Sequence, residues 1–227
     1  MRSSTTNVCV LDNIPVNIQV SEVLKRLRLR SENKQVEAVV REVIELITPI
    51  ARPKAIYKYA HIDTRNKNML EIDGVGFVSH ALRVFDGMQP VFPYVVTCGR
   101  EIDEMELPSA TTMKTYCLTV IKDMCKIAAS SYLQDYLVKN YTLQQVSSVE
   151  PGHPQSWPLA QLKGLFSLLG NVENLIGVRL TDKFIMLPAN SISGIFYQTA
   201  TVIDRCSVCS SKTCQDRTSP YAPALLE

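Results

Sequence analysis

The sequence contains no apolar run close to the roughly 18 residues needed to cross a bilayer. Its opening stretch, MRSSTTNVCVLDNIPV, also lacks the long apolar core of a secretory signal peptide. The 227 residues show no internal repeat and no low-complexity block. These absences favour a soluble, cytoplasmic globular protein over a membrane-embedded or secreted one.

The sequence also has no large excess of positive or of negative charge. The chain carries 24 Lys and Arg against 22 Asp and Glu, a formal net charge of +2, and the two signs are intermixed. Nothing in this balance predicts binding to nucleic acid or to an anionic membrane surface. With 46% hydrophobic residues, the composition is that of a globular protein with a substantial core.

Residues for conventional catalysis are scarce. There are only three histidines, His61, His80 and His153. The sequence has no Gly-x-Ser-x-Gly elbow, no Walker loop and no His-Glu-x-x-His motif. The pair Gly74-x-Gly76 lacks the third glycine of a dinucleotide loop. An ordinary hydrolase, kinase or zinc protease is therefore not supported, and whether the chain is an enzyme stays open.

The seven cysteines fall into two groups. Four are scattered in apolar surroundings and are expected to be small buried hydrophobes: Cys9, Cys98, Cys117 and Cys125. The others form the cluster Cys206-x-x-Cys209-x4-Cys214, whose thiolates could coordinate one metal ion from a tight turn. The cluster predicts a site for zinc or an iron–sulfur cluster, with a redox thiol pair or a metal-free reduced tail as alternatives. A fourth ligand would have to come from Cys98, Asp204, a second chain or an exogenous group.

Several helices are expected from apolar residues at helical spacing. Ser21 is expected to cap a short helix, SEVLKRLRL, and Ser31 a longer one, ENKQVEAVVREVIELITPI. The longer helix has one apolar stripe and one charged face, so it should lie on the surface of a core. The longest helical pattern covers about residues 113–137, and a further capped helix is expected at about residues 77–85.

Strands are expected in four stretches rich in β-branched and aromatic residues. They are one or two strands before Val20, two in PKAIYKYAHIDTRNKNMLEID around a turn at residues 64–67, one in QPVFPYVVTCG, and two or three in IGVRLTDKFIMLPANSISGIFYQTATVI, interrupted at Pro188. Strands come in pairs with helices grouped between them, and regular βαβ alternation is absent. The pattern predicts an α+β fold rather than a doubly wound sheet.

A proline-rich loop precedes a helical pattern in SVEPGHPQSWPLAQLKGLFSLLG. Pro151 and Pro154 fix φ at two points, and Gly152 permits a turn that other residues resist. The loop therefore holds backbone N–H and C=O groups in fixed directions, which suits recognition of a small polar ligand. The alternative is a rigid connection, with Ser156 as N-cap of the helix and Pro158 near its first position.

Two segments in this order carry a family resemblance. PGHPQSWPLAQLKGLFSLLG resembles the Pro-Gly-Tyr-Pro segment and following helix of the reactivation domain of cobalamin-dependent methionine synthase. IGVRLTDKFIMLPANSISGIFY resembles that domain's Gly-x-x-Leu-Thr-x-x-Phe-x-Met-x-Pro-x-x-Ser-x-Ser-Gly segment. The shared positions are Gly177, Leu180, Thr181, Phe184, Met186, Pro188, Ser191, Ser193 and Gly194. The match is strongest over residues 148–197, and the cysteine-rich end is similar to that of small stand-alone relatives found beside corrinoid proteins.

The resemblance implies a twisted antiparallel sheet flanked by helices. In that family the domain binds S-adenosylmethionine in a shallow groove and sits over the corrinoid. A flavodoxin-type or ferredoxin-type donor supplies one electron to Co(II), and the sulfonium methyl group traps the resulting Co(I) as methylcobalt. The resemblance thus implies a partner that carries cobalamin, either a corrinoid protein or a cobalamin-dependent methyltransferase. This chain lacks the Asp-x-His-x-x-Gly motif of common corrinoid carriers, so it is expected to be their partner.

The resemblance also places ligand contacts on the loop, the long helix and the last strand: Ser148, Glu150, Pro151, Gly152, His153, Ser131, Ser191 and Ser193. Some of these positions depart from the family. Ser148 stands where the family has an arginine that clamps the ligand carboxylate, His153 where it has a tyrosine, and Ser131 where it has a glutamate. A hydroxyl cannot supply the bidentate charged fork of an arginine.

Two functions are therefore expected. The first is a stand-alone reactivation-type protein that binds S-adenosylmethionine, docks on the corrinoid, or does both, and so supports reductive methylation of cobalamin in methionine biosynthesis or another corrinoid-dependent methyl transfer. The second is a redox or metal accessory that binds a corrinoid protein but has lost S-adenosylmethionine binding. The expected division is into N-terminal strands and helices (1–70), a reactivation-domain-like core (71–205) and a cysteine-rich tail (206–227).

Overall fold

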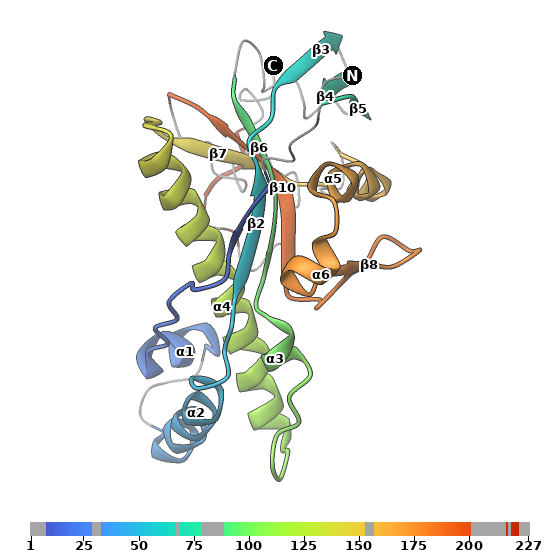
Figure 1. Cartoon of the computed structure of the whole chain (residues 1–227). Helices are drawn as coiled ribbons and strands as arrows, with labels where there is room; N and C mark the ends of the chain where they lie inside the picture. The colour runs from blue at the N-terminus through green and yellow to red at the C-terminus, as the bar shows by residue number, and fades with distance from the viewer. Residues whose placement is uncertain are drawn as a thin grey trace.

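A five-stranded antiparallel sheet with the strand order β1-β2-β6-β10-β7 forms the centre of the molecule (Figure 1). The computed structural model describes residues 8–28, 33–66, 69–78, 89–152, 157–200, 217 and 219–222. The strands are β1 (Val8–Leu11), β2 (Lys54–Lys58), β6 (Val91–Thr97), β10 (Ser191–Gln198) and β7 (Val146–Val149). The central strand β6 is buried along its whole length, because both faces of the sheet are covered.

Two smaller sheets extend this framework. One consists of β3 (Ile62–Asn66), β4 (Met69–Ile72) and β5 (Val75–Val78), and the other is the hairpin of β8 (Arg179–Leu180) and β9 (Met186–Leu187). Asp73 and Gly74 join β4 to β5 with φ angles of 45° and 77°. Positive φ at both turn residues is what a tight hairpin needs, and Asp-Gly adopts it readily.

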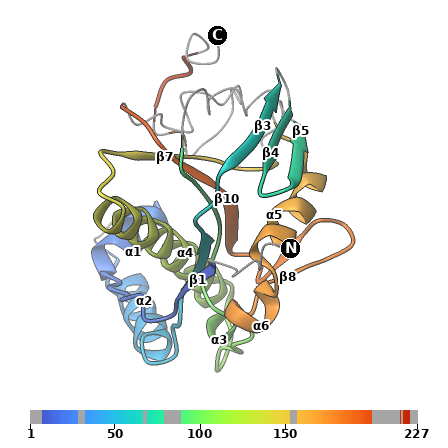
Figure 2. The same ribbon diagram turned by 45° about the horizontal axis from the view of Figure 1, so that its top comes forward.

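The helices lie in two layers, one on each side of the large sheet (Figures 1 and 2). They are α1 (Val20–Arg26), α2 (Lys34–Ile47), α3 (Arg100–Asp103), α4 (Thr112–Asn140), α5 (Leu162–Leu169) and α6 (Val172–Ile176), with a 3₁₀ turn η2 (Leu159–Gln161) before α5. The views show α1, α2 and α4 on one side, with α5 and α6 on the other. Among the described residues, no helix combines the length and the apolarity required to span a membrane.

Alternation along β10 divides the core between these two layers. Phe196 points towards α4, where it packs with Tyr94, Ala129 and Leu133. The next residue, Tyr197, points to the opposite face, where the cluster also includes side chains of α5 and the small three-stranded sheet: Leu162, Leu165, Leu168, Leu70, Ile72 and Phe77. The α+β fold and the antiparallel sheet flanked by helices are therefore confirmed. The division into three parts stays a prediction; the large sheet takes strands from both sides of residue 70.

The prediction of a helix at residues 77–85 is wrong for its first two residues. Phe77 and Val78 belong to strand β5, and residues 79–88 lie outside the described part of the chain. The hairpin turn at residues 73–74 sends the chain back along β4, which brings Phe77 into the core. Its ring lies edge-on to Trp157 with centroids 5.9 Å apart. Burial of this aromatic side chain, favourable by about 2–3 kcal/mol, overrides the helical pattern.

The expected caps and the proline-rich connection also differ in detail. Helix α1 has Gln19 at its N-cap position, so Ser21 lies inside the first turn. The cap of α2 is Asn33, whose side-chain oxygen accepts hydrogen bonds from two backbone N–H groups of the first turn. Pro158 occupies the N-cap position of η2 rather than the first helical position. Residues 54–72 form three strands instead of two, because β2 joins the large sheet and β3 and β4 pair with each other.

Candidate functional site

The Pro-Gly loop begins where the edge strand β7 ends. β7 pairs with β10 through Val149 opposite Ile195 and Ser148 opposite Phe196. Residues that are directly opposite in a sheet share a face, so Ser148 lies on the face that α4 covers. The two segments that carry the family resemblance are therefore neighbours in one sheet.

Glu150, the first residue after β7, has its carboxylate held by two hydroxyl groups. The hydroxyl of Tyr94 donates a hydrogen bond to Oε1 of Glu150 at 3.2 Å, and the hydroxyl of Ser148 donates to the same oxygen at 3.3 Å. The ring of Tyr94 is itself fixed, because it stacks on Phe196 with centroids 4.2 Å apart. The wall of the candidate site therefore presents a half-buried carboxylate beside Ser148.

Gly194 explains why the Ser-x-Ser-Gly strand needs a glycine here. A Cβ atom on Gly194 would lie 2.4 Å from the backbone oxygen of Val149 and 3.1 Å from Cγ of Glu150. A contact of that length with backbone cannot be relieved by a side-chain rotation. The missing side chain thus lets the end of β7, with Glu150, lie close against β10.

Gly152 shapes the turn that follows. Its φ of +94° is one that residues with a side chain rarely adopt, and its N–H donates to the carbonyl oxygen of Trp157 at 2.8 Å. A Cβ atom at this position would also meet Leu159 at 3.0 Å. Pro151 precedes this turn, and His153 lies outside the described residues.

The two serines of the last strand lie on the other face of the sheet from Ser148. Ser191 and Ser193 alternate with Gly194 and Phe196, so they face the α5–α6 layer. The Ser191 hydroxyl donates to the carbonyl oxygen of Pro188 at 2.8 Å. The Ser193 hydroxyl is buried and has no hydrogen-bond partner in the described structure. Strand β10 therefore places Ser191 and Ser193 close to the Pro-Gly loop along the sheet. Their side chains, however, lie on the opposite face of the sheet from Ser148.

Ser131 is exposed on α4, the helix that covers the same face as Ser148. One turn further along α4, the side-chain amide of Gln134 donates to the carbonyl oxygen of Val146 at 3.0 Å and ties the helix to β7. Ser131 is therefore on the element that flanks the edge strand. Whether any of these predicted residues contacts a ligand stays a prediction.

Tyr94 also belongs to the candidate site, although no sequence pattern indicates this role. It lies in the middle of an apolar strand, where a tyrosine passes for another large core residue. A buried tyrosine hydroxyl usually has a hydrogen-bond partner, and here that partner is Glu150. The pairing depends on strand register, which no local pattern reveals.

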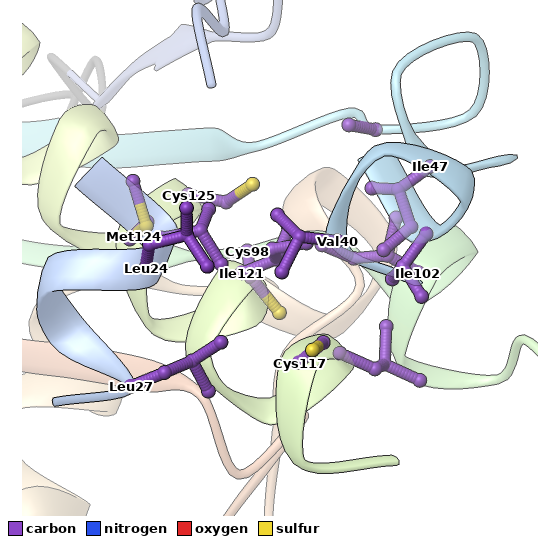
Figure 3. Close-up of a cluster of buried hydrophobic side chains, with 14 residues drawn as sticks. Leu24, Leu27, Val40, Ile47, Cys98, Ile102, Cys117, Ile121, Met124 and Cys125 are labelled. Atoms are coloured by element: carbon purple, nitrogen blue, oxygen red, sulfur yellow. The ribbon is translucent and has the colours of Figure 1, made fainter. Parts of the chain in front are cut away.

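Three of the cysteines expected to be buried lie in the core between α1, α2, α4 and the end of β6 (Figure 3). Cys98, Cys117 and Cys125 are fully buried free thiols, which confirms their expected role, while Cys9 is half-buried. Burial raises the pKa of the Cys98 thiol to about 12 and that of Cys125 to about 11. Protonated thiols of this kind are poor nucleophiles and poor metal ligands.

The predicted metal cluster of Cys206, Cys209 and Cys214 lies outside the described residues. Within the described residues, no group of at least three His, Cys, Asp or Glu side chains is arranged to hold a metal ion. Zinc or iron–sulfur binding by the tail therefore stays a prediction from the sequence.

The same fold occurs in a solved structure described as the MetH reactivation domain bound to AdoHcy. The superposition has a TM-score of 0.62 and covers 86% of this chain and 79% of that one, with 14% sequence identity. No family model and no curated protein sequence matches the chain. The likeness confirms, at the level of the fold, the resemblance drawn from the two sequence segments.

Proposed function

We propose that this chain is a reactivation-type protein that binds S-adenosylmethionine and docks on a corrinoid-carrying partner to support reductive methylation of cobalamin. The observation that carries the proposal is the pairing of β7 with β10, which puts the Pro-Gly loop and the Ser-x-Ser-Gly strand side by side. The solved domain with this fold was crystallised with AdoHcy, the demethylated product of such a ligand.

The residues at the loop fit the positively charged part of S-adenosylmethionine. The Glu150 carboxylate, oriented by Tyr94 and Ser148, would attract a sulfonium or ammonium group placed beside it. The described residues of the loop include no arginine that could pair with the ligand's own carboxylate, and the backbone N–H groups of the loop could donate hydrogen bonds to it instead. S-Adenosylmethionine would supply the methyl group, and a partner's cobalamin would receive it. The role of this chain is to hold the donor and orient it towards the partner.

Calorimetry on the full chain tests the ligand claim. We expect S-adenosylmethionine to bind more tightly than S-adenosylhomocysteine, because the homocysteine form lacks the sulfonium charge that Glu150 would attract. Glu150→Gln should reduce this preference by several-fold, about the size of one half-buried charge interaction. The matched control is Glu106→Gln, an exposed glutamate outside the site. Absence of heat with either ligand at near-millimolar concentration, with and without a corrinoid protein, would exclude ligand binding.

A second candidate is a redox or metal accessory that binds a corrinoid protein without S-adenosylmethionine. Ser148 favours it, because its hydroxyl is engaged with Glu150 and supplies no positive charge for a ligand carboxylate. The tail cysteines would then provide the chemistry, with a flavodoxin-type or ferredoxin-type protein as electron donor. Anaerobic purification followed by metal analysis and visible absorbance distinguishes an iron–sulfur cluster, zinc and free thiols. A colourless, metal-free protein without affinity for a corrinoid protein would rule this candidate out.

A further inference from the structure

A groove with a volume of about 930 Å³ lies between α1 and α4, apart from the Pro-Gly loop. Its walls come from the segments on either side of α1, from α1 itself, from α4, and from Asn190 just before β10. Pockets of roughly 300–1,000 Å³ are typical of small-molecule sites. The space is therefore sufficient for a ligand of moderate size.

The groove is more positive than the rest of the chain. Its described lining carries four basic residues, Lys25, Arg26, Arg28 and Lys126, against two acidic ones, Glu22 and Asp123. The difference of two positive charges equals the net charge of +2 of the entire 227-residue chain. All residues outside this lining, taken together, therefore carry no net charge.

Ion pairs hold two of these cations in place. Asp123 on α4 receives a hydrogen bond from Arg26 of α1 at 3.2 Å, and its other oxygen pairs with Lys126. One carboxylate therefore serves two cations, so a net positive charge remains beside it. The Lys126 side chain is only 19% exposed, which lowers screening by water around this charge.

Part of the groove's lining is apolar. Val16 and Ile18 from the segment before α1 line it together with Val120 and Ile127 of α4. Val16, Ile18 and Val120 also pack against the buried core between α1, α2 and α4. Tyr116 lies at the same groove and is 49% exposed. A half-exposed tyrosine among apolar lining residues offers a face on which a planar ring can stack.

We propose that the α1–α4 groove binds a small anion that carries a planar ring and a phosphate group, of the nucleoside diphosphate class. The negative charge of the phosphates is attracted by a lining in which basic residues outnumber acidic ones, and guanidinium groups bind phosphate oxygens in a bidentate manner. A nucleic acid would need a longer basic surface than a chain of net charge +2 provides. The proposal does not rest on the proposed function, because none of the groove's described lining residues lies in the Pro-Gly loop.

Calorimetric titration of the full chain with ADP, inorganic pyrophosphate and adenosine tests this site. We expect ADP to bind most tightly, pyrophosphate less tightly, and adenosine most weakly. Lys25→Ser should weaken ADP and pyrophosphate alike, by about tenfold for the loss of one charged hydrogen bond. Tyr116→Ser should weaken ADP but leave pyrophosphate unchanged, because only the nucleoside carries a ring.

The control is Lys139→Ser, which removes the same charge from an exposed position at the far end of α4. It should leave ADP affinity unchanged, and circular dichroism should show all variants folded. Three results would overturn the site: no heat with near-millimolar ADP, an equal loss in Lys139→Ser and Lys25→Ser, or poly-glutamate binding as tightly as ADP. The last result would indicate a surface for an acidic protein instead of a small-molecule site.

Discussion

The hydroxyl of Tyr94 donates a 3.2 Å hydrogen bond to Oε1 of Glu150, although 56 residues separate them. The bond joins the central strand β6 to the residue that follows the edge strand β7. It passes across β10 at Gly194, where a Cβ atom would crowd both partners, 3.1 Å from Cγ of Glu150 and 3.2 Å from the Tyr94 ring. The glycine, the tyrosine and the glutamate therefore act together to fix the end of β7.

Tyr94→Phe should weaken this attachment while keeping the stack on Phe196. The variant removes one hydrogen bond to a charged group, which contributes about 1.5–3 kcal/mol. We expect the free energy of unfolding to fall by about 1.5 kcal/mol, measured by urea denaturation. Tyr132→Phe, at a tyrosine that is 38% exposed, is the control and should change stability by less than about 0.5 kcal/mol. Equal stability of Tyr94→Phe and the wild type would mean that the Glu150 contact contributes nothing.

Gly194→Ala should be more damaging than the small size of alanine suggests. The added methyl would lie 2.4 Å from the Val149 carbonyl oxygen, so β7 would have to move away from β10. Overpacking of this kind costs about 1–3 kcal/mol. Gly76→Ala is the matched control, because Gly76 also lies in a strand and its added methyl would meet nothing within 4 Å. Thermal denaturation of both variants measures the difference, and similar melting temperatures would show that the strand end adjusts freely.

Ser191 and Ser193 allow a paired test, because they face the same side of β10 and differ in hydrogen bonding. Ser191→Ala removes a bond to the Pro188 carbonyl oxygen and should cost about 1 kcal/mol. Ser193→Ala removes a buried hydroxyl without a partner in the described structure, so it should be neutral or stabilising. Urea denaturation of the two variants gives the comparison. A loss of more than about 1 kcal/mol in Ser193→Ala would reveal a partner for that hydroxyl, such as an ordered water molecule.

The parts of the fold that were predictable from sequence are those with a long or unbroken local pattern. The helix expected at residues 113–137 is α4, Thr112–Asn140, and the apolar stretch QPVFPYVVTCG is the central strand β6. The break at Pro188 is also confirmed, since β9 ends at Leu187 and β10 begins at Ser191. In these segments, local preference and tertiary packing favour the same structure.

The remaining features depend on contacts between distant residues. GVGFV fits a helix start as well as a strand, and burial of Phe77 against distant residues favours the strand. One of these residues is Gly164 on α5, where a Cβ would lie 2.8 Å from the Phe77 ring. The helix therefore accommodates this strand residue by having no side chain there. The face on which each candidate site residue lies is set by register: Ser148 and Ser193 are both near the loop, yet they point to opposite sides of the sheet. Spacing within a motif does not contain that information.

The buried thiols predict selective protection from alkylation. Cys98, Cys117 and Cys125 are fully buried, and burial raises the pKa of each above its ordinary value. Iodoacetamide reacts with the thiolate, so these three should remain unmodified in the native protein at mildly alkaline pH and react once urea unfolds the chain. Peptide mass spectrometry reads each cysteine separately. Rapid modification of Cys125 in the native state would contradict the burial of the α4 face on which it lies.

The same thiols predict a loss of stability at alkaline pH. Below the ordinary thiol pKa of 9, Cys98 and Cys125 are protonated in both folded and unfolded chains and cause no pH dependence. Above it, the unfolded chain releases these protons, whereas the folded chain keeps them up to pKa values of about 12 and about 11. Each thiol therefore lowers the free energy of unfolding by about 1.4 kcal/mol at about pH 10, relative to neutral pH.

Urea denaturation at about pH 8 and about pH 10 measures this loss. Lysine and tyrosine side chains titrate nearby, so the comparison is made with Cys125→Ala, which removes one thiol and leaves the other groups in place. The variant should lose less stability than the wild type between the two pH values, by about 1.4 kcal/mol. Identical losses would mean that Cys125 ionises inside the folded protein, and the core around α4 would then have to admit water.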